Sequence, residues 1–233
     1  MVRVDDVYQK VLALANKEQR GYITPQDFNL FANQAQMEIF EQYFYNINIA
    51  RKGQGNDTVY ADVDDMLEEK LQIFESFDSL ATILTYYPNL PNYIYRIHEV
   101  HVENRKKAEI LNTKDFNACR IGGPLLKPSS TRPIVNIRDN VMMVVGDNNA
   151  TINPRFIYYF RVPAKVNWTY VVINKQAMYD ANPSTQDFEL HPSEKNQLIN
   201  KILKLAGISN QQPDIMKAGQ GMDAATIQLQ PKI

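Results

Sequence analysis

The chain has 233 residues, with 25 Lys and Arg against 26 Asp and Glu, which gives a formal net charge of -1 at pH 7. Hydrophobic residues make up 44% and charged residues 22%, so the composition is that of a folded protein and argues against global disorder. The near-neutral charge excludes a strong long-range attraction to nucleic acid, and the single cysteine, Cys119, excludes an internal disulfide.

No part of the sequence predicts export or membrane insertion. The first residues lack the apolar segment of a secretion signal. No stretch approaches the roughly 18 consecutive apolar residues that a spanning helix needs. We therefore expect the protein to be made and folded in a cytoplasm, with no membrane partner.

The first third of the chain is predicted to be helical. Apolar residues recur at three- and four-residue steps over residues 4–15, which predicts an amphipathic helix. Thr24 and Asp27 flank Pro25 in a helix-start signal, so a second helix is expected over residues 25–45. A third helix is expected to follow from about residue 62.

The second of these helices has apolar side chains on two sides, whereas a helix on the surface of a monomer normally has one apolar stripe. One explanation is a central helix buried within its own domain. The other is that one stripe contacts a neighbouring subunit. The first stripe consists of Phe28, Phe31, Ala35, Ile39 and Tyr43. The second stripe, the candidate subunit interface, consists of Leu30, Met37, Phe40 and Phe44.

From about residue 80 the pattern changes to that of strands. Residues 134–138 and 141–145, separated by a two-residue turn, predict a β-hairpin. Further strands are expected over residues 93–102, 155–162 and 169–173. A last amphipathic helix is then expected to begin at the His-Pro-Ser-Glu sequence of residues 191–194, with Gly207 as its left-handed C-terminal cap.

These elements predict an α+β fold in which a helical bundle, built from three N-terminal helices and one late helix, carries an inserted β-rich subdomain. The expected boundaries are 1–79 for the N-terminal helices, 80–185 for the insertion, 186–208 for the returning helix and 209–233 for an extended, flexible C-terminal arm. We expect the arm to become ordered on a partner. Its candidate docking residues are Ile215, Met216, Met222, Ile227 and Leu229.

No set of residues predicts catalysis or metal binding. His98 and His101 are the only close histidine pair, and a spacing of three on a strand is expected to place them on opposite faces. Asp62, Asp64 and Asp65 are explained by the start of the third helix, where carboxylates interact favourably with the helix dipole. We therefore expect no enzymatic activity, no metal and no cofactor.

Two basic clusters leave a second function open. Arg51–Lys52 and Arg105–Lys107 each lie in a predicted loop or turn, where solvated charge is the usual explanation. A local basic patch of this kind can still bind phosphates. The alternative is therefore a DNA-packaging or replication accessory protein that binds nucleic acid nonspecifically.

Two stretches of the chain resemble one group of phage virion proteins. The first is VYQKVLALANKEQRGYITP at residues 7–25, continued by FNLF at 28–31 and QAQMEIF at 34–40. The second is DFELHPSE at residues 187–194, continued by LI and KILKLAGI up to residue 208. Both are similar to head-to-tail adaptor or neck ring proteins of crAss-like and related short-tailed bacteriophages. The centre of the chain matches these proteins in the order of its elements more than in its amino-acid sequence.

The resemblance implies a structural virion protein without an enzymatic site. Such a protein forms a ring in the phage neck or tail, connects the portal to the tail and continues the DNA conduit. The implied partners are further copies of the chain in a closed ring, expected to be a dodecamer, together with the portal protein and other neck or tail ring proteins. Passing DNA would be contacted without sequence specificity, and the expected location is the virion.

Overall fold

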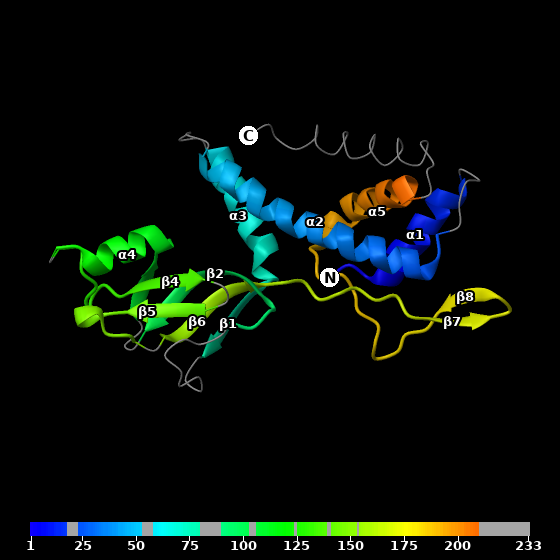
Figure 1. The fold of residues 1–233 in the computed structure, drawn as a ribbon. Coiled ribbons are helices and arrows are strands. Elements are labelled where there is room, and N and C mark those ends of the chain that lie inside the picture. The colour runs from blue at the N-terminus through cyan, green and yellow to red at the C-terminus, as the bar shows by residue number, and fades with distance from the viewer. Residues whose placement is uncertain are drawn as a thin grey trace. The chain divides into compact units, whose positions relative to one another are not determined.

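The structure, a computed structural model, describes residues 1–17, 23–52, 58–79, 90–102, 106–123, 125–138, 141–152 and 154–209. It consists of two compact units, shown as a ribbon in Figure 1. The helical unit contains residues 1–73 and 163–233, and the sheet unit contains residues 74–162.

The fold is mixed α+β, as the sequence predicts. The helical unit contains α1 (Val4–Lys17), α2 (Pro25–Lys52), α3 (Thr58–Gln72), β7 (Tyr170–Ile173), β8 (Gln176–Tyr179), the 3-10 helix η4 (Pro192–Glu194) and α5 (Lys195–Ser209). The sheet unit contains β1 (Glu75–Ser79), β2 (Ile94–Val102), β3 (Lys107–Ile110), α4 (Thr113–Ile121), β4 (Ile134–Arg138), β5 (Val141–Val145), the 3-10 helix η3 (Asp147–Asn149) and β6 (Pro154–Arg161).

The start of α2 follows the predicted capping pattern. The backbone N–H of Asp27 donates to Thr24 Oγ1 at 3.1 Å, and the Thr24 hydroxyl donates to Asp27 Oδ2 at 2.6 Å. Pro25 is the first helical residue, where its missing N–H costs nothing. The helix continues past residue 45 and ends at Lys52.

Helix α2 is buried on more than one side within its own unit, because it packs against both α3 and α5. All five residues of the first stripe are buried. In the second stripe Phe40 is also fully buried, Met37 and Phe44 are half-buried, and Leu30 is 65% exposed. Phe40 is therefore a core residue and does not face a neighbouring subunit, which corrects the expectation for that position. For Phe40, the central-helix explanation accounts for the second stripe.

The sheet unit is built on a six-stranded sheet with the strand order β1-β6-β2-β3-β4-β5. Neighbouring strands are antiparallel except for β3 and β4, which are parallel. A parallel pair requires a crossover connection, and here the connection contains α4. One core cluster of the unit consists of Leu90, Ile97, Val100, Val102, Ala108, Val135, Met142, Val144, Ile157 and Tyr159. A second, smaller cluster beneath α4 consists of Phe116, Cys119, Ile134 and Val145.

The unit boundaries differ from the expected 80 and 185. Strand β1 pairs with β6 from Glu75 to Ser79, so the sheet unit begins at residue 74. The unit ends at residue 162, because β7 and β8 form a separate two-stranded sheet within the helical unit. Helix α5 continues through Gly207 to Ser209, so Gly207 is not a left-handed cap. The expected docking residues of the C-terminal arm lie outside the described residues.

Across the described ranges, no helix combines the length and hydropathy that crossing a bilayer requires.

Candidate assembly surfaces

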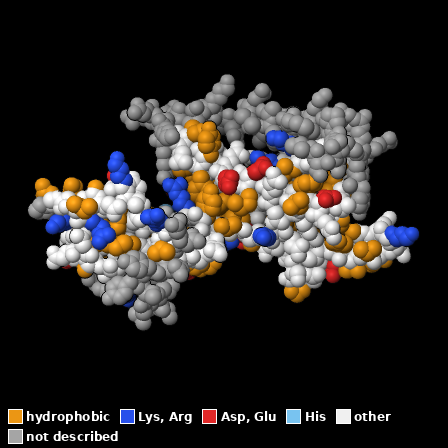
Figure 2. Space-filling view, in the orientation of Figure 1, with side chains coloured by type: hydrophobic (Ala, Val, Ile, Leu, Met, Phe, Trp, Pro, Cys, Tyr) orange, Lys and Arg blue, Asp and Glu red, His pale blue; other side chains and the backbone are white. Residues whose placement is uncertain are grey.

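The β7–β8 hairpin exposes aliphatic side chains on both of its faces. Val171 lies opposite Met178, and Val172 lies opposite Ala177 on the other face. The exposed fractions are 47% for Val171, 63% for Val172, 51% for Ile173 and 53% for Met178. Figure 2 shows hydrophobic side chains on the visible face of this hairpin. Among the described strands none pairs with either edge of the hairpin, and its aliphatic side chains are exposed.

The hairpin has a tight two-residue turn. Asn174 and Lys175 join the strands with positive φ values of 50° and 65°. Positive φ at both central residues is the feature of a type I′ turn, whose twist matches that of the flanking strands. The turn fixes the pairing of Ile173 with Gln176 and thereby the side on which every other hairpin side chain lies.

The base of the hairpin is held by Trp168, which is buried. Its ring stacks on Tyr170 and Tyr179, with centroids 5.7 and 6.1 Å away, and lies 4.0 Å from the Tyr8 centroid. Its Nε1–H donates to Asp5 Oδ1 at 3.1 Å. The hairpin is therefore fixed to α1 through one large aromatic side chain, whereas its aliphatic tip is exposed.

The chain leading into the hairpin pairs with side chains of α2 as if with another strand. The carboxamides of Asn33 and its helix neighbours each offer N–H donors and a C=O acceptor side by side, as a peptide group offers one of each. Asn33 Nδ2 donates to the Val166 carbonyl at 2.9 Å, and the Val166 N–H donates to Asn33 Oδ1 at 2.8 Å. We call this set the amide ladder: Asn29 with Trp168, Asn33 with Val166, and Gln36 with Ala164.

The amide ladder is possible because the rise between its positions on the helix is close to the rise between alternate positions on the extended segment. The four-residue step from 29 to 33 on the helix rises by about 6 Å and the three-residue step from 33 to 36 by about 4.5 Å, whereas positions two apart on a strand rise by about 6.6 Å. Residues 29, 33 and 36 therefore match residues 168, 166 and 164 in register. Apolar periodicity alone does not reveal this feature. The signal was present as three side-chain amides at helical spacing on α2.

Further segments complete this part of the helical unit. Residues Asn167 and Gln186 exchange two backbone hydrogen bonds, each of 3.1 Å. Val2 and Phe188 exchange two more, of 3.2 and 3.1 Å. Glu189 Oε2 accepts from the Ala164 N–H at 2.7 Å. The segment before the hairpin is therefore bonded on one edge to α2 and on the other to the chain before α5, which makes it a rigid support.

The two close histidines lie on the same face of the sheet, contrary to the expectation. The ring centroids of His98 and His101 lie 6.2 and 5.3 Å from that of Tyr158. A register shift in β2 next to His98 changes the alternation of side chains. His98 Nε2 lies 3.2 Å from a Glu75 carboxylate oxygen, and His101 Nε2 lies 3.0 Å from one of Glu99. Within the described ranges, no group of three or more His, Cys, Asp or Glu is placed to hold a metal.

Two groups of the sheet unit have shifted pKa values that keep them in one charge state near neutral pH. Hydrogen bonds from Lys107 and His101 lower the pKa of Glu99 to about 2. Burial raises the pKa of Tyr159, and a hydrogen bond to Asp78 adds to the shift. A general acid or base works best with a pKa near the working pH. Glu99 and Tyr159 are therefore explained as structural hydrogen-bonding groups.

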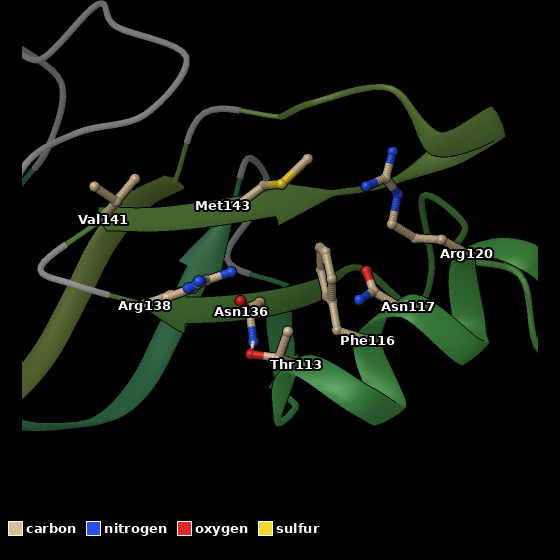
Figure 3. A pocket seen from close by; sticks show the side chains of 8 residues that line it. All are labelled: Thr113, Phe116, Asn117, Arg120, Asn136, Arg138, Val141 and Met143. Carbon is tan, nitrogen blue, oxygen red and sulfur yellow. Dashed lines mark hydrogen bonds between the residues drawn. The ribbon is translucent and has the colours of Figure 1, made fainter.

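A groove of about 360 Å³ lies between α4 and the β4–β5 hairpin. Figure 3 shows its side chains, which come from one face of the helix and one face of the hairpin. The lining residues are Thr113, Phe116, Asn117, Arg120, Asn136, Arg138, Val141 and Met143. We call it the arginine groove, because the charged residues among its described lining are Arg120 and Arg138.

No protein-family model matches the chain, and no curated protein is detectably similar to it in sequence.

Proposed function

We propose that this protein is a structural component of the virion that forms a ring in a phage neck or tail. The ring would connect the portal to the tail and continue the DNA conduit. In this proposal the helical unit is a bundle that carries the sheet unit as a β-rich insertion. The β7–β8 hairpin is the observation that carries the proposal, because its apolar faces are exposed whereas its base is rigidly held.

A closed ring of identical copies needs two different surfaces on each copy. The hairpin suits one of them, since a strand edge and alternate side chains can add to a sheet or a groove of the next copy. Its support by Trp168 and the amide ladder reduces the entropy lost when it binds. A second surface is offered by α2, where Leu30 and Tyr45 are each 65% exposed beside the half-buried Met37 and Phe44.

The proposed partners are further copies of the chain in a closed ring, the portal protein and other neck or tail ring proteins. Passing DNA would be contacted without sequence specificity. The proposed location is the neck or tail of the virion. Mass spectrometry of purified phage particles tests this location, and absence of the protein from them would contradict it.

The oligomeric state tests the ring directly. We expect light scattering and native mass spectrometry of the purified chain, and electron micrographs of particles, to give one closed ring. Substituting Val172→Ser and Ile173→Ser should prevent the ring and leave a folded monomer. Leu125→Ser is the matched control, because Leu125 is 95% exposed in the sheet unit. A wild-type chain that stays monomeric at all concentrations and is missing from virions would refute the proposal.

A nucleic-acid accessory protein is the second candidate, and the charge of the sheet unit favours it. Residues 74–162 carry 11 Lys and Arg against 8 Asp and Glu. A DNA-binding protein of this kind should lose affinity steeply as salt rises, because binding releases counterions from the phosphates. Fluorescence anisotropy with a labelled duplex at several salt concentrations distinguishes it from the ring protein.

A further inference from the structure

The two units of the chain have opposite formal charges. The sheet unit carries 11 basic and 8 acidic residues, a charge of +3, whereas the rest of the chain carries 14 basic and 18 acidic residues, a charge of -4. Copies arranged head to tail bring different surfaces of the same chain together. Opposite charges on those surfaces favour association and suppress contacts in the wrong register.

The arginine groove is the most defined basic feature of the sheet unit. Its helix side is formed by residues 113, 116, 117 and 120, which follow the spacing of one helix face. Its strand side is formed by two directly paired positions, Asn136 with Met143 and Arg138 with Val141. Figure 3 shows the guanidinium groups of Arg120 and Arg138 on opposite sides of the Phe116 ring. Among the described lining residues, none carries a carboxylate.

Arg120 is held in place but not fully satisfied. Its guanidinium carbon lies 5.8 Å from the centre of the Phe116 ring, in a cation–π contact. Its backbone carbonyl accepts from Asn149 Nδ2 at 3.1 Å. The Nε–H is buried and has no hydrogen-bond partner among the described residues. A buried donor without an acceptor is unfavourable. The positive charge of the guanidinium, which lines the groove, favours an anionic oxygen ligand there.

Matching acidic groups lie on α3 of the helical unit. Asp65 and Glu69 are exposed and stand four positions apart, so their carboxylates lie on one side of the helix. Met66 beside them is 57% exposed, whereas Leu67 and Leu71 are buried. This exposed face of α3 therefore combines two carboxylates with one long apolar side chain.

We propose that Asp65 and Glu69 of one copy bind in the arginine groove of the next copy around the ring. This inference rests on the proposed function and adds the residues that determine how copies associate. Guanidinium and carboxylate groups form strong, directional hydrogen bonds. Met66 would contact the apolar part of the groove, at Val141 and Met143. An apolar contact of this kind favours a protein segment over a phosphate backbone.

Charge reversal in two separate variants tests the pairing. Variant A carries Arg120→Glu and Arg138→Glu, and variant B carries Asp65→Lys and Glu69→Lys. Each variant alone should associate at least about tenfold more weakly than the wild type, because like charges then meet at the contact. An equimolar mixture of A and B should form rings again, since each altered surface meets a complementary one on the other variant.

The mixture also excludes a contact within one chain, because mixing cannot repair an intramolecular pair. The matched control for A carries Lys114→Glu and Lys127→Glu, which change the charge of the same unit equally at exposed positions outside the groove. This control should assemble as the wild type does. Native mass spectrometry gives the composition of the mixed rings, and circular dichroism shows that each variant is folded. If A unfolds, Arg138→Glu alone replaces it.

Three results would overturn the inference while leaving the ring intact. In the first, variants A and B each form rings as the wild type does. In the second, both variants are folded but their equimolar mixture fails to assemble. Variant A could also assemble normally but lose affinity for a single-stranded oligonucleotide, which would make nucleic acid the occupant. A wild-type chain that forms no ring would instead refute the proposed function.

Discussion

Asn33 on α2 and Val166 lie 133 residues apart in the chain, yet the Asn33 side chain forms both hydrogen bonds that a neighbouring strand would form with Val166. The amide side chain thus takes the place of a peptide group. As a result, the edge of an extended segment is satisfied by a helix instead of a sheet. The position of the β7–β8 hairpin depends on this pairing, because the segment leads directly into β7.

Replacing Asn33 should therefore destabilise the helical unit. In Asn33→Ala the N–H and C=O of Val166 lose their partners, and we expect a loss of about 2–4 kcal/mol in the free energy of unfolding. Urea titration followed by tryptophan fluorescence measures it, since Trp168 is the only tryptophan and is buried beside the amide ladder. Gln34→Ala, on the exposed side of α2, is the control and should change the stability by less than about 0.5 kcal/mol.

Lys70 and Glu194 form a second link within the helical unit, between α3 and the 3-10 helix η4 that precedes α5. The Glu194 side chain is only 6% exposed, so Lys70→Met leaves a buried carboxylate without its charge partner. We expect a loss of about 3 kcal/mol in the free energy of unfolding, as for other buried pairs from which one partner is removed. The double variant Lys70→Met, Glu194→Met should be more stable than Lys70→Met alone. An equally unstable double variant would show that the charge is not the cause.

The sheet unit should lose stability in acid through Glu99. Its pKa is lowered from 4.5 to about 2 by hydrogen bonds from Lys107 and His101. A lowered pKa in the folded state stabilises the fold above about pH 4.5, and this contribution is lost as the pH falls towards 2. In Lys107→Met the pKa of Glu99 should rise, because the hydrogen bond that lowers it most is removed. NMR titration of the Glu99 carboxyl carbon measures both values, and an unchanged pKa would contradict the assignment.

The turn of the β7–β8 hairpin should be improved by glycine. Lys175 has a φ of 65°, which is unfavourable for a residue with a side chain. Lys175→Gly should therefore protect the β7 and β8 amides against hydrogen exchange, by up to about 1 kcal/mol in the opening free energy. Lys175→Ala keeps the Cβ atom and should give no gain. Equal protection in the two variants would mean that backbone strain is not the cause.

The parts of the fold that depend on local signals were predictable from the sequence. The cap formed by Thr24 and Asp27 was one, and the β4–β5 hairpin with its two-residue turn was another. Both depend on residues within a few positions of one another. Local chemistry alone determines such elements.

The parts that depend on distant partners were not predictable in this way. The pattern of α2 showed two apolar stripes, but it could not show that Phe40 is covered by the same unit. The expected faces of His98 and His101 assumed that side chains alternate strictly along the strand. The register shift in β2 interrupts this alternation. The arginine groove joins a helix face to a pair of strands, and its residues span positions 113 to 143 without any motif.

The sheet unit begins and ends at adjacent points of its own fold, since the Phe74 carbonyl accepts a hydrogen bond from the Arg161 N–H at 2.9 Å. A module whose entry and exit meet can be excised and bridged by a short linker, or grafted into another host. A single recombination event therefore suffices to exchange this module as one piece, while the helices on either side of the insertion keep the same sequence.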